Sequence, residues 1–165
     1  MVVLVILVVM FFFYVMTFVL RGAFTLGAFV DFVMFDYRGS VVVINFWGSW
    51  CAPCRAEAPD LSTLASRYRS LGVRFLGIDI QDEPASAEAF MHTFRITYPS
   101  LNDPGDEIAL AFRKTVPPQA IPTTLVIDRS GHIAARIVGG ATYDALKALI
   151  ARVLGSHAVA AGASQ

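Results

Sequence analysis

The sequence predicts an α/β fold in which helices flank a central mixed β-sheet, preceded by an N-terminal transmembrane helix. Residues 1–20 carry no charged side chain, and an apolar helix of about 20 residues crosses the hydrocarbon core of a bilayer. Two apolar, β-branched runs, Val41–Trp47 and Val73–Ile80, predict buried strands. With a helix between them they form a right-handed parallel βαβ unit. Residues 123–128 and 132–138 flank a short turn and predict an antiparallel hairpin.

The helical spacing of apolar residues predicts a helix between the two buried strands that begins at Pro53 and ends at Gly72. Pro59 lies inside this helix and is expected to kink it. Residues 100–106, SLNDPGD, are interpreted as a loop. Three further helices are predicted: residues 85–95, residues 107–113, and a last helix that Thr142 caps and that ends at Val153.

These predictions divide the chain into four segments: a transmembrane anchor or uncleaved signal anchor over residues 1–21, a linker with a marginal N-terminal strand over 22–39, the α/β domain over 40–154, and a disordered tail over 155–165. A cleaved signal peptide normally begins with basic residues, and no Lys or Arg precedes Arg21. An uncleaved anchor is therefore favoured. The single charge after the span weakly favours a cytoplasmic C-terminal side, which a basic leader before the first residue would reverse.

The segment FWGSWCAPCRAEAP contains the only two cysteines, Cys51 and Cys54. A structural zinc site needs four ligands, whereas the chain has one C-x-x-C pair and three scattered histidines, His92, His132 and His157, so no metal site is predicted. A disulfide that closes so short a loop adds little stability. A redox role explains the placement better, because the strand-to-helix junction favours a Cys51 thiolate and Cys54, one turn inside the helix, is shielded.

The segment FWGSWCAPC after a Val-rich strand, the helix that contains Pro59, and IPTTLVID together resemble the thioredoxin superfamily. More narrowly, NFWGSWCAPCRAEAPDL, the predicted anchor and the added helix over residues 85–95 resemble the TlpA/ResA-type membrane-anchored thiol-disulfide oxidoreductases. The resemblance covers residues 38–153. It implies a thioredoxin-like fold over residues 40–154, a redox-active disulfide between the two cysteines, and no other cofactor.

The resemblance also implies the roles of individual residues around the cysteines. Cys51 would attack the disulfide of a substrate, and Cys54 would resolve the mixed disulfide that results. Trp50 and Pro53 would frame the pair. Pro122 would be the cis-proline that faces it.

Three polar or backbone positions refine this expected site. The backbone of Ile121 would pair with an extended substrate chain, although this residue could instead be ordinary core. Thioredoxins proper carry a buried carboxylate six residues before the first cysteine, where this chain has Asn45. Glu57, one helical turn after Cys54, resembles the active-site glutamate of the ResA-like subgroup and could take the Cys54 proton. The alternative is an exposed charge on the helix face.

The resemblance implies that the protein reduces specific disulfides in extracytoplasmic proteins, such as apocytochrome c during cytochrome c maturation. Expected partners are a disulfide-bearing protein, a membrane-embedded thiol donor, and the membrane itself. A single-pass N-terminal helix would anchor the protein in the bacterial cell membrane. The redox domain would be monomeric and would lie on the extracytoplasmic side. The chain has 13 basic and 13 acidic residues and no basic stripe, which argues against nucleic acid.

Other functions on the same fold remain open from the sequence. The pair could oxidise or isomerise disulfides of secreted proteins, because direction depends on reduction potential. A copper-binding chaperone is a further alternative, although such sites resemble C-x-x-x-C with a distant histidine. A peroxide-reducing enzyme is disfavoured, because its usual T-x-x-C arrangement is absent.

Overall fold

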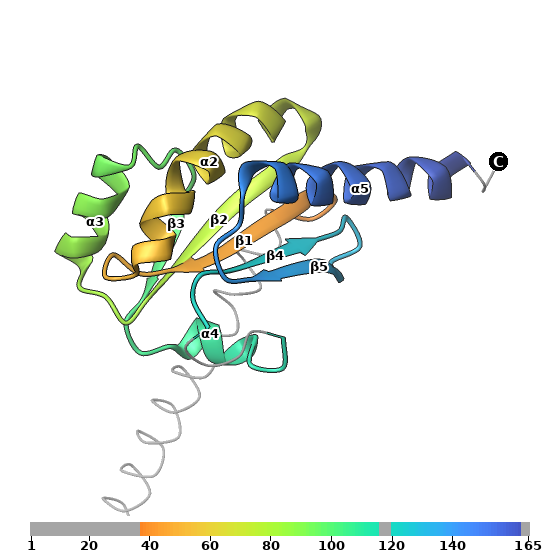
Figure 1. Cartoon of the computed structure of the whole chain (residues 1–165). Helices are drawn as coiled ribbons and strands as arrows, with labels where there is room; N and C mark the ends of the chain where they lie inside the picture. The colour runs from red at the N-terminus through yellow and green to blue at the C-terminus, as the bar shows by residue number, and fades with distance from the viewer. Residues whose placement is uncertain (1–36, 116–119, 163–165) are drawn as a thin grey trace, which may run out of the picture. The chain divides into compact units, whose positions relative to one another are not determined.

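Figure 1 shows the computed structural model, which describes residues 37–115 and 120–162 of the chain. The chain divides into two units, Met1–Arg38 and Gly39–Gln165, and the elements given below belong to the second unit. The predicted anchor over residues 1–21 lies outside the described residues, as does almost all of the predicted linker. Within the described residues, no helix is both long enough and apolar enough to cross a membrane.

The second unit is built on a five-stranded mixed sheet with the strand order β3-β2-β1-β4-β5. The strands are β1 (Val41–Trp47), β2 (Val73–Ile80), β3 (Ser100–Asp103), β4 (Thr123–Ile127) and β5 (Ile133–Val138). Strand β2 pairs in parallel with both β1 and β3. Strand β4 runs antiparallel to β1 and forms an antiparallel hairpin with β5. The predicted parallel βαβ unit and the predicted hairpin are therefore confirmed.

Helices cover both faces of this sheet. They are α2 (Ala52–Tyr68), α3 (Pro84–Thr93), α4 (Glu107–Ala111) and α5 (Tyr143–Gly162), with a short 3-10 helix, η1 (Arg69–Leu71), after α2. In Figure 1, α2 and α5 lie along one side of the sheet and α4 lies on the other. Val41 and Val43 of β1 share one buried core with Leu64 of α2 and Ile150 of α5.

Every residue of β1 is buried, and its alternate side chains face opposite layers. Val43 packs in the core that α2 and α5 close. Phe46 makes an edge contact with the ring of Phe112, just after α4, at a centroid separation of 5.4 Å. This two-sided burial explains why the strand is an unbroken apolar run rather than an alternating one.

Two segments differ from the sequence-based expectation. Residues 100–103, predicted as loop, form the edge strand β3; the prediction failed because Asn102 and Asp103 are polar residues that usually disfavour strands but here bond to neighbouring elements. Helix α5 continues past Val153 to Gly162. The predicted disordered tail is therefore helical as far as Gly162, in keeping with the high helix propensity of its alanines.

Candidate active site

Cys51 and Cys54 lie where β1 ends and α2 begins. Cys51 is the N-cap residue of α2, and Pro53 lies in the first turn, where its missing N–H has no helical partner to lose. The two cysteines form a disulfide with a Cα–Cα distance of 5.3 Å, and the Cys54 N–H donates to the Cys51 Sγ at 3.2 Å. Because the N–H groups and dipole of a helix N-terminus favour an anion, this geometry would stabilise a Cys51 thiolate after reduction.

The residues that frame the pair stand at the surface. Trp50 is 51% exposed, and Pro53 is also exposed, whereas only 4% of Cys51 is accessible. The Trp50 Nε1 donates to the Gln81 carbonyl at 3.2 Å, which fixes the indole across the end of β2. An incoming chain that reaches Cys51 would therefore meet an exposed aromatic ring and an exposed proline first.

An apolar cluster lies around the disulfide. The ring of Trp47 stacks on the ring of Phe90 from α3, with centroids 4.5 Å apart. The buried members of this cluster are Trp47, Cys51, Cys54, Ala58, Ala87 and Phe90. The predicted helix over residues 85–95 thus corresponds to α3 and contributes to the site. Such surroundings have a low local dielectric, which strengthens the influence of any nearby charge on the thiols.

The Ile121–Pro122 segment lies directly before β4. Its peptide bond is cis, as the resemblance implied. Pro122 is buried, and its carbonyl accepts from the Gly139 N–H at 2.9 Å. Ile121 is partly buried and packs against the apolar cluster that contains both cysteines. The structure therefore brings Ile121 to the site through its side chain.

Glu57 lies on the inner side of α2, where only 3% of it is exposed. Its Oε1 accepts from the Asn45 Nδ2 at 2.8 Å, and its Oε2 accepts from the Ala141 N–H at 2.6 Å. Burial raises the pKa of Glu57, and these two hydrogen bonds oppose part of that rise. The alternative of an exposed helix-face charge is therefore wrong.

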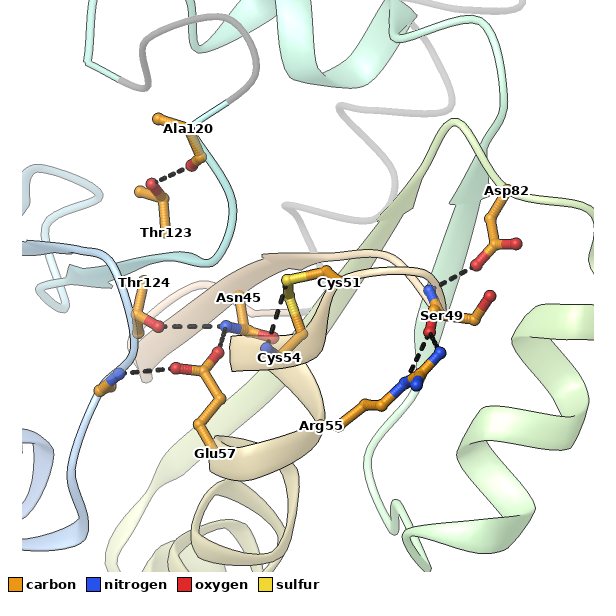
Figure 2. Close-up of a disulfide and its surroundings, with 11 residues drawn as sticks. Asn45, Ser49, Cys51, Cys54, Arg55, Glu57, Asp82, Ala120, Thr123 and Thr124 are labelled. Atoms are coloured by element: carbon orange, nitrogen blue, oxygen red, sulfur yellow. Dashed lines mark hydrogen bonds between the residues drawn. A yellow bond between two sulfur atoms is a disulfide. The ribbon is translucent and has the colours of Figure 1, made fainter.

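Asn45 holds the buried glutamate in place, a role that the sequence analysis missed. Its Nδ2 donates both to Glu57 and to the Thr124 Oγ1, the latter at 3.1 Å, as Figure 2 shows. Asn45 and Thr124 are direct partners in the β1–β4 pairing. The sequence signal for this contact was a polar residue inside each of two apolar strands, since buried polar groups require hydrogen-bond partners.

The loop before Cys51 is anchored from both sides through Ser49. Its carbonyl accepts from the Arg55 guanidinium at 3.0 and 2.7 Å. Its N–H donates to the Asp82 Oδ2 at 2.6 Å. Figure 2 shows Ser49 between these two side chains. No local sequence pattern points to Asp82, which follows β2 and lies far from the cysteines in the chain.

Metal-ligand geometry is not found in the described part of the chain. No group of three or more His, Cys, Asp or Glu side chains there could hold a metal ion. His92 is exposed on α3, and His132 lies 3.9 Å from the Asp128 carboxylate in an exposed turn. The side chain of His157 lies outside the described residues. The copper-chaperone alternative therefore gains no third ligand from the described histidines.

A protein-family model described as the AhpC/TSA family matches residues 22–136. Among curated relatives, the thiol-disulfide oxidoreductase ResA of Geobacillus kaustophilus is 37% identical over 109 residues, which cover 66% of this chain and 60% of that protein. The thiol:disulfide interchange protein HelX of Rhodobacter capsulatus is 36% identical over 123 residues, which cover 73% of this chain and 65% of that protein. The chain thus matches less than two thirds of the length of either relative.

Solved structures give the same result for the fold. A secreted thiol-disulfide isomerase from Corynebacterium glutamicum has a TM-score of 0.70 and 31% identity, with 74% of this chain and 75% of that chain covered. A thiol:disulfide interchange protein from Chlorobium tepidum has a TM-score of 0.67 and 30% identity, with 72% and 83% covered. The predicted thioredoxin-like fold and the resemblance to ResA-type proteins are confirmed. The chain therefore belongs to the AhpC/TSA family and has a thioredoxin-like fold.

Proposed function

We propose that this protein is a thiol-disulfide oxidoreductase in which Cys51 and Cys54 are the redox-active pair. The observation that carries the proposal is the disulfide at the start of α2, with Cys51 as the N-cap residue and Cys54 buried behind it. The names of the ResA and HelX relatives support the same reaction class. The disulfide itself is the redox group, and no other cofactor is part of the proposal.

The proposed reaction exchanges one disulfide for another. In the reduced protein, the Cys51 thiolate attacks a sulfur of the substrate disulfide, which forms a mixed disulfide and releases one substrate thiolate. Cys54 loses its proton and attacks the Cys51 sulfur, which releases the second substrate thiolate and forms the Cys51–Cys54 disulfide. Two electrons pass from the protein to the substrate, and the two substrate thiolates take up protons.

Glu57 is proposed as the group that accepts the Cys54 proton. It lies one helical turn after Cys54 on α2, and each of its carboxylate oxygens accepts a single hydrogen bond and so keeps a lone pair free. Burial raises its pKa, which makes the carboxylate a stronger proton acceptor than an exposed one. Asn45 fixes the orientation of the carboxylate without itself being able to titrate.

The proposed direction is reduction of client disulfides, with oxidation or isomerisation as the alternative. The names of the solved neighbours include an isomerase and an interchange protein, so the reaction class alone does not select a direction. Equilibration of the purified domain with glutathione buffers measures the potential directly. A value near that of DsbA, about −120 mV, would favour oxidation of clients instead.

The proposed clients are disulfide-bearing proteins outside the cytoplasm, with the oxidised cysteine pair of apocytochrome c as one candidate. A membrane-embedded thiol donor would restore the dithiol. A single-pass N-terminal helix would hold the domain, as a monomer, at the extracytoplasmic side of the bacterial cell membrane. For client binding, no hydrogen bond within the described residues uses the Ile121 backbone. That backbone is therefore available to pair with an extended client segment beside Trp50 and Pro53.

Trapping of the mixed disulfide tests the proposal. The Cys54→Ala variant keeps the attacking thiol and lacks the resolving one, so clients should stay covalently attached to Cys51. These adducts should migrate as higher-mass bands on a non-reducing gel and disappear with reductant. The Cys51→Ala/Cys54→Ala double variant is the matched control and should give none. If Cys54→Ala forms no more adducts than the double variant, the redox function is refuted.

A further inference from the structure

Besides Glu57, two acidic residues lie buried at the end of β2, close to the loop that leads to Cys51. Asp79 is 1% exposed and Asp82 is 9% exposed. Both oxygens of Asp82 accept backbone hydrogen bonds, from the Ser49 N–H at 2.6 Å and from the Glu83 N–H at 2.9 Å. Asp79 accepts only from the Asn102 Nδ2, at 2.8 Å on Oδ2. Its Oδ1 is buried and has no partner.

Neither carboxyl group of this pair is neutralised by a bound positive charge. Within the described ranges, no Lys or Arg forms an ion pair with either carboxyl group. The charged groups on the neighbouring elements include Asp103 of β3, Asp106 and Glu107 at the start of α4, the exposed Glu83, and Arg55 of α2, which binds the Ser49 carbonyl. Two buried carboxylates in such surroundings favour a state in which one of them keeps a proton.

The hydrogen bonds identify which residue keeps the proton. Asp82 accepts two N–H donors, which stabilise its ionised form. Asp79 has an oxygen without a donor, so a proton on that residue removes a buried negative charge that is poorly solvated. Burial, and then the charge of the adjacent Asp82, raise the pKa of Asp79 to about 7, against the opposing Asn102 hydrogen bond.

This pair is connected to the active-site loop by two contacts. Asp82 binds the N–H of Ser49, two residues before Cys51, and the carbonyl of the adjacent Gln81 accepts from the Trp50 indole. Gln81 has a φ of 50°, an uncommon value for a residue with a side chain. The end of β2 therefore holds both residues that precede the reactive cysteine.

We propose that Asp82 is a positioning residue for the redox pair and that a proton held by Asp79 keeps Asp82, and with it the Ser49–Trp50 segment, in place before Cys51. Loss of that proton leaves two buried negative charges that repel each other, and movement of Asp82 toward solvent relieves this repulsion. That movement breaks the Ser49 contact and loosens the segment. The inference rests on the proposed function, because only then does the segment border a reacting sulfur.

The test uses the oxidised full-length protein, in which the thiols cannot titrate. Proton–nitrogen NMR spectra between pH 5 and pH 8.5 follow the Ser49 amide in the wild type, in Asp79→Asn, and in Glu83→Gln, which removes an exposed carboxylate next to Asp82. The Ser49 resonance should shift with a midpoint at a pH of about 7 in the wild type and the control. Asp79→Asn should abolish this transition while the remaining spectrum shows that it is folded. A transition that survives in Asp79→Asn, or the absence of a transition in the wild type, refutes the role of the Asp79 proton.

A kinetic measurement separates this inference from the proposed function. The rate at which dithiothreitol reduces the Cys51–Cys54 disulfide is measured over the same pH range, and the ratio of Asp79→Asn to wild type cancels the titration of the reagent. The ratio should change through the pH of the Ser49 transition, and the ratio of Glu83→Gln to wild type should stay flat. If client trapping succeeds but the ratio of Asp79→Asn to wild type does not change with pH, the positioning role is refuted and the redox function stands. If trapping fails, the redox function fails, and the Ser49 titration still decides whether the Asp79 proton controls the Ser49 contact.

Discussion

Two buried carboxyl groups lie near the redox pair, Glu57 on α2 and Asp79 on β2, and they differ in how their oxygens are bonded. Glu57 receives one N–H on each oxygen. Asp79 receives one amide donor on Oδ2 and none on Oδ1. Their exposures are nearly the same, 3% and 1%. The two groups therefore show what hydrogen-bond partners and charged neighbours add to the effect of burial on a carboxyl group.

Burial alone does not determine the chemistry of these two carboxyl groups. Burial raises the pKa of both residues. At Glu57 two donors lower the cost of the charged form and fix the carboxylate on α2, whereas at Asp79 the neighbouring Asp82 adds to that cost. Glu57 is thus suited to exchange a proton in place, and Asp79 to retain one. Substitutions at the two positions should consequently have opposite effects.

The largest expected effect is that of Glu57→Ala on stability. The change leaves one N–H of the Asn45 amide and the Ala141 N–H buried without an acceptor and opens a small cavity, and each unsatisfied buried group costs about 1–3 kcal/mol. The free energy of unfolding should fall by about 3 kcal/mol. Urea denaturation of the oxidised protein measures this fall. The control, Glu88→Ala, removes an exposed carboxylate from α3 and should change little; equal losses in both variants would contradict the role of the buried acceptors.

Asp79→Asn should raise the free energy of unfolding, and the size of this rise should depend on pH. In the wild type, the folded state holds the Asp79 proton up to a pH of about 7, whereas the unfolded chain releases it near 3.8. Native Asp79 therefore costs stability increasingly as pH rises between those values. The difference in unfolding free energy, variant minus wild type, should grow by about 2 kcal/mol between pH 5 and pH 8. Urea titrations at several pH values give this difference. If the unfolding free energies of the variant and the wild type change in parallel with pH, the prediction is contradicted.

Glu57→Gln should have a smaller effect on stability and a specific effect on the thiols. The amide keeps the size of the side chain but lacks the negative charge that would oppose ionisation of a nearby thiol. The apparent titration of the reduced cysteine pair, followed by thiolate absorbance, should therefore move to lower pH. Glu88→Gln on the exposed side of α3 is the matched control. An unchanged titration in Glu57→Gln would remove Glu57 from the proton transfer.

The sequence was sufficient for the parts of the fold and site that depend on local pattern. The apolar run at β1, the helical spacing of α2 and the C-x-x-C segment predicted the βαβ unit and the position of the disulfide, because each is written in consecutive residues. Thr142 was also identified correctly as a cap, since its Oγ1 accepts from the Ala145 N–H at 3.3 Å.

The contacts that hold the site together could not be predicted, because they join residues distant in the chain. In the sequence, Asn45 marks only the absence of the usual buried acid, whereas in the structure its Nδ2 donates to both Glu57 and Thr124. The contact of Asp82 with the site could not be predicted, because its partner Ser49 belongs to another loop. Strand β3 was missed because the polar side chains that make it look like a loop are bonded to neighbouring elements. These features depend on tertiary pairing, which no single segment specifies.

Thr124→Val should have the smallest effect. It tests whether the orientation of Glu57 depends on Thr124, which contacts Glu57 only through Asn45. The change keeps the shape of the side chain and removes the Oγ1 that accepts from Asn45. One buried N–H then lacks an acceptor, so the free energy of unfolding should fall by about 1 kcal/mol. Thr93→Val, at the exposed end of α3, is the control. Because Asn45 still donates to Glu57, the thiol titration should stay as in the wild type. A shift as large as that of Glu57→Gln would mean that Thr124 is needed to orient the carboxylate.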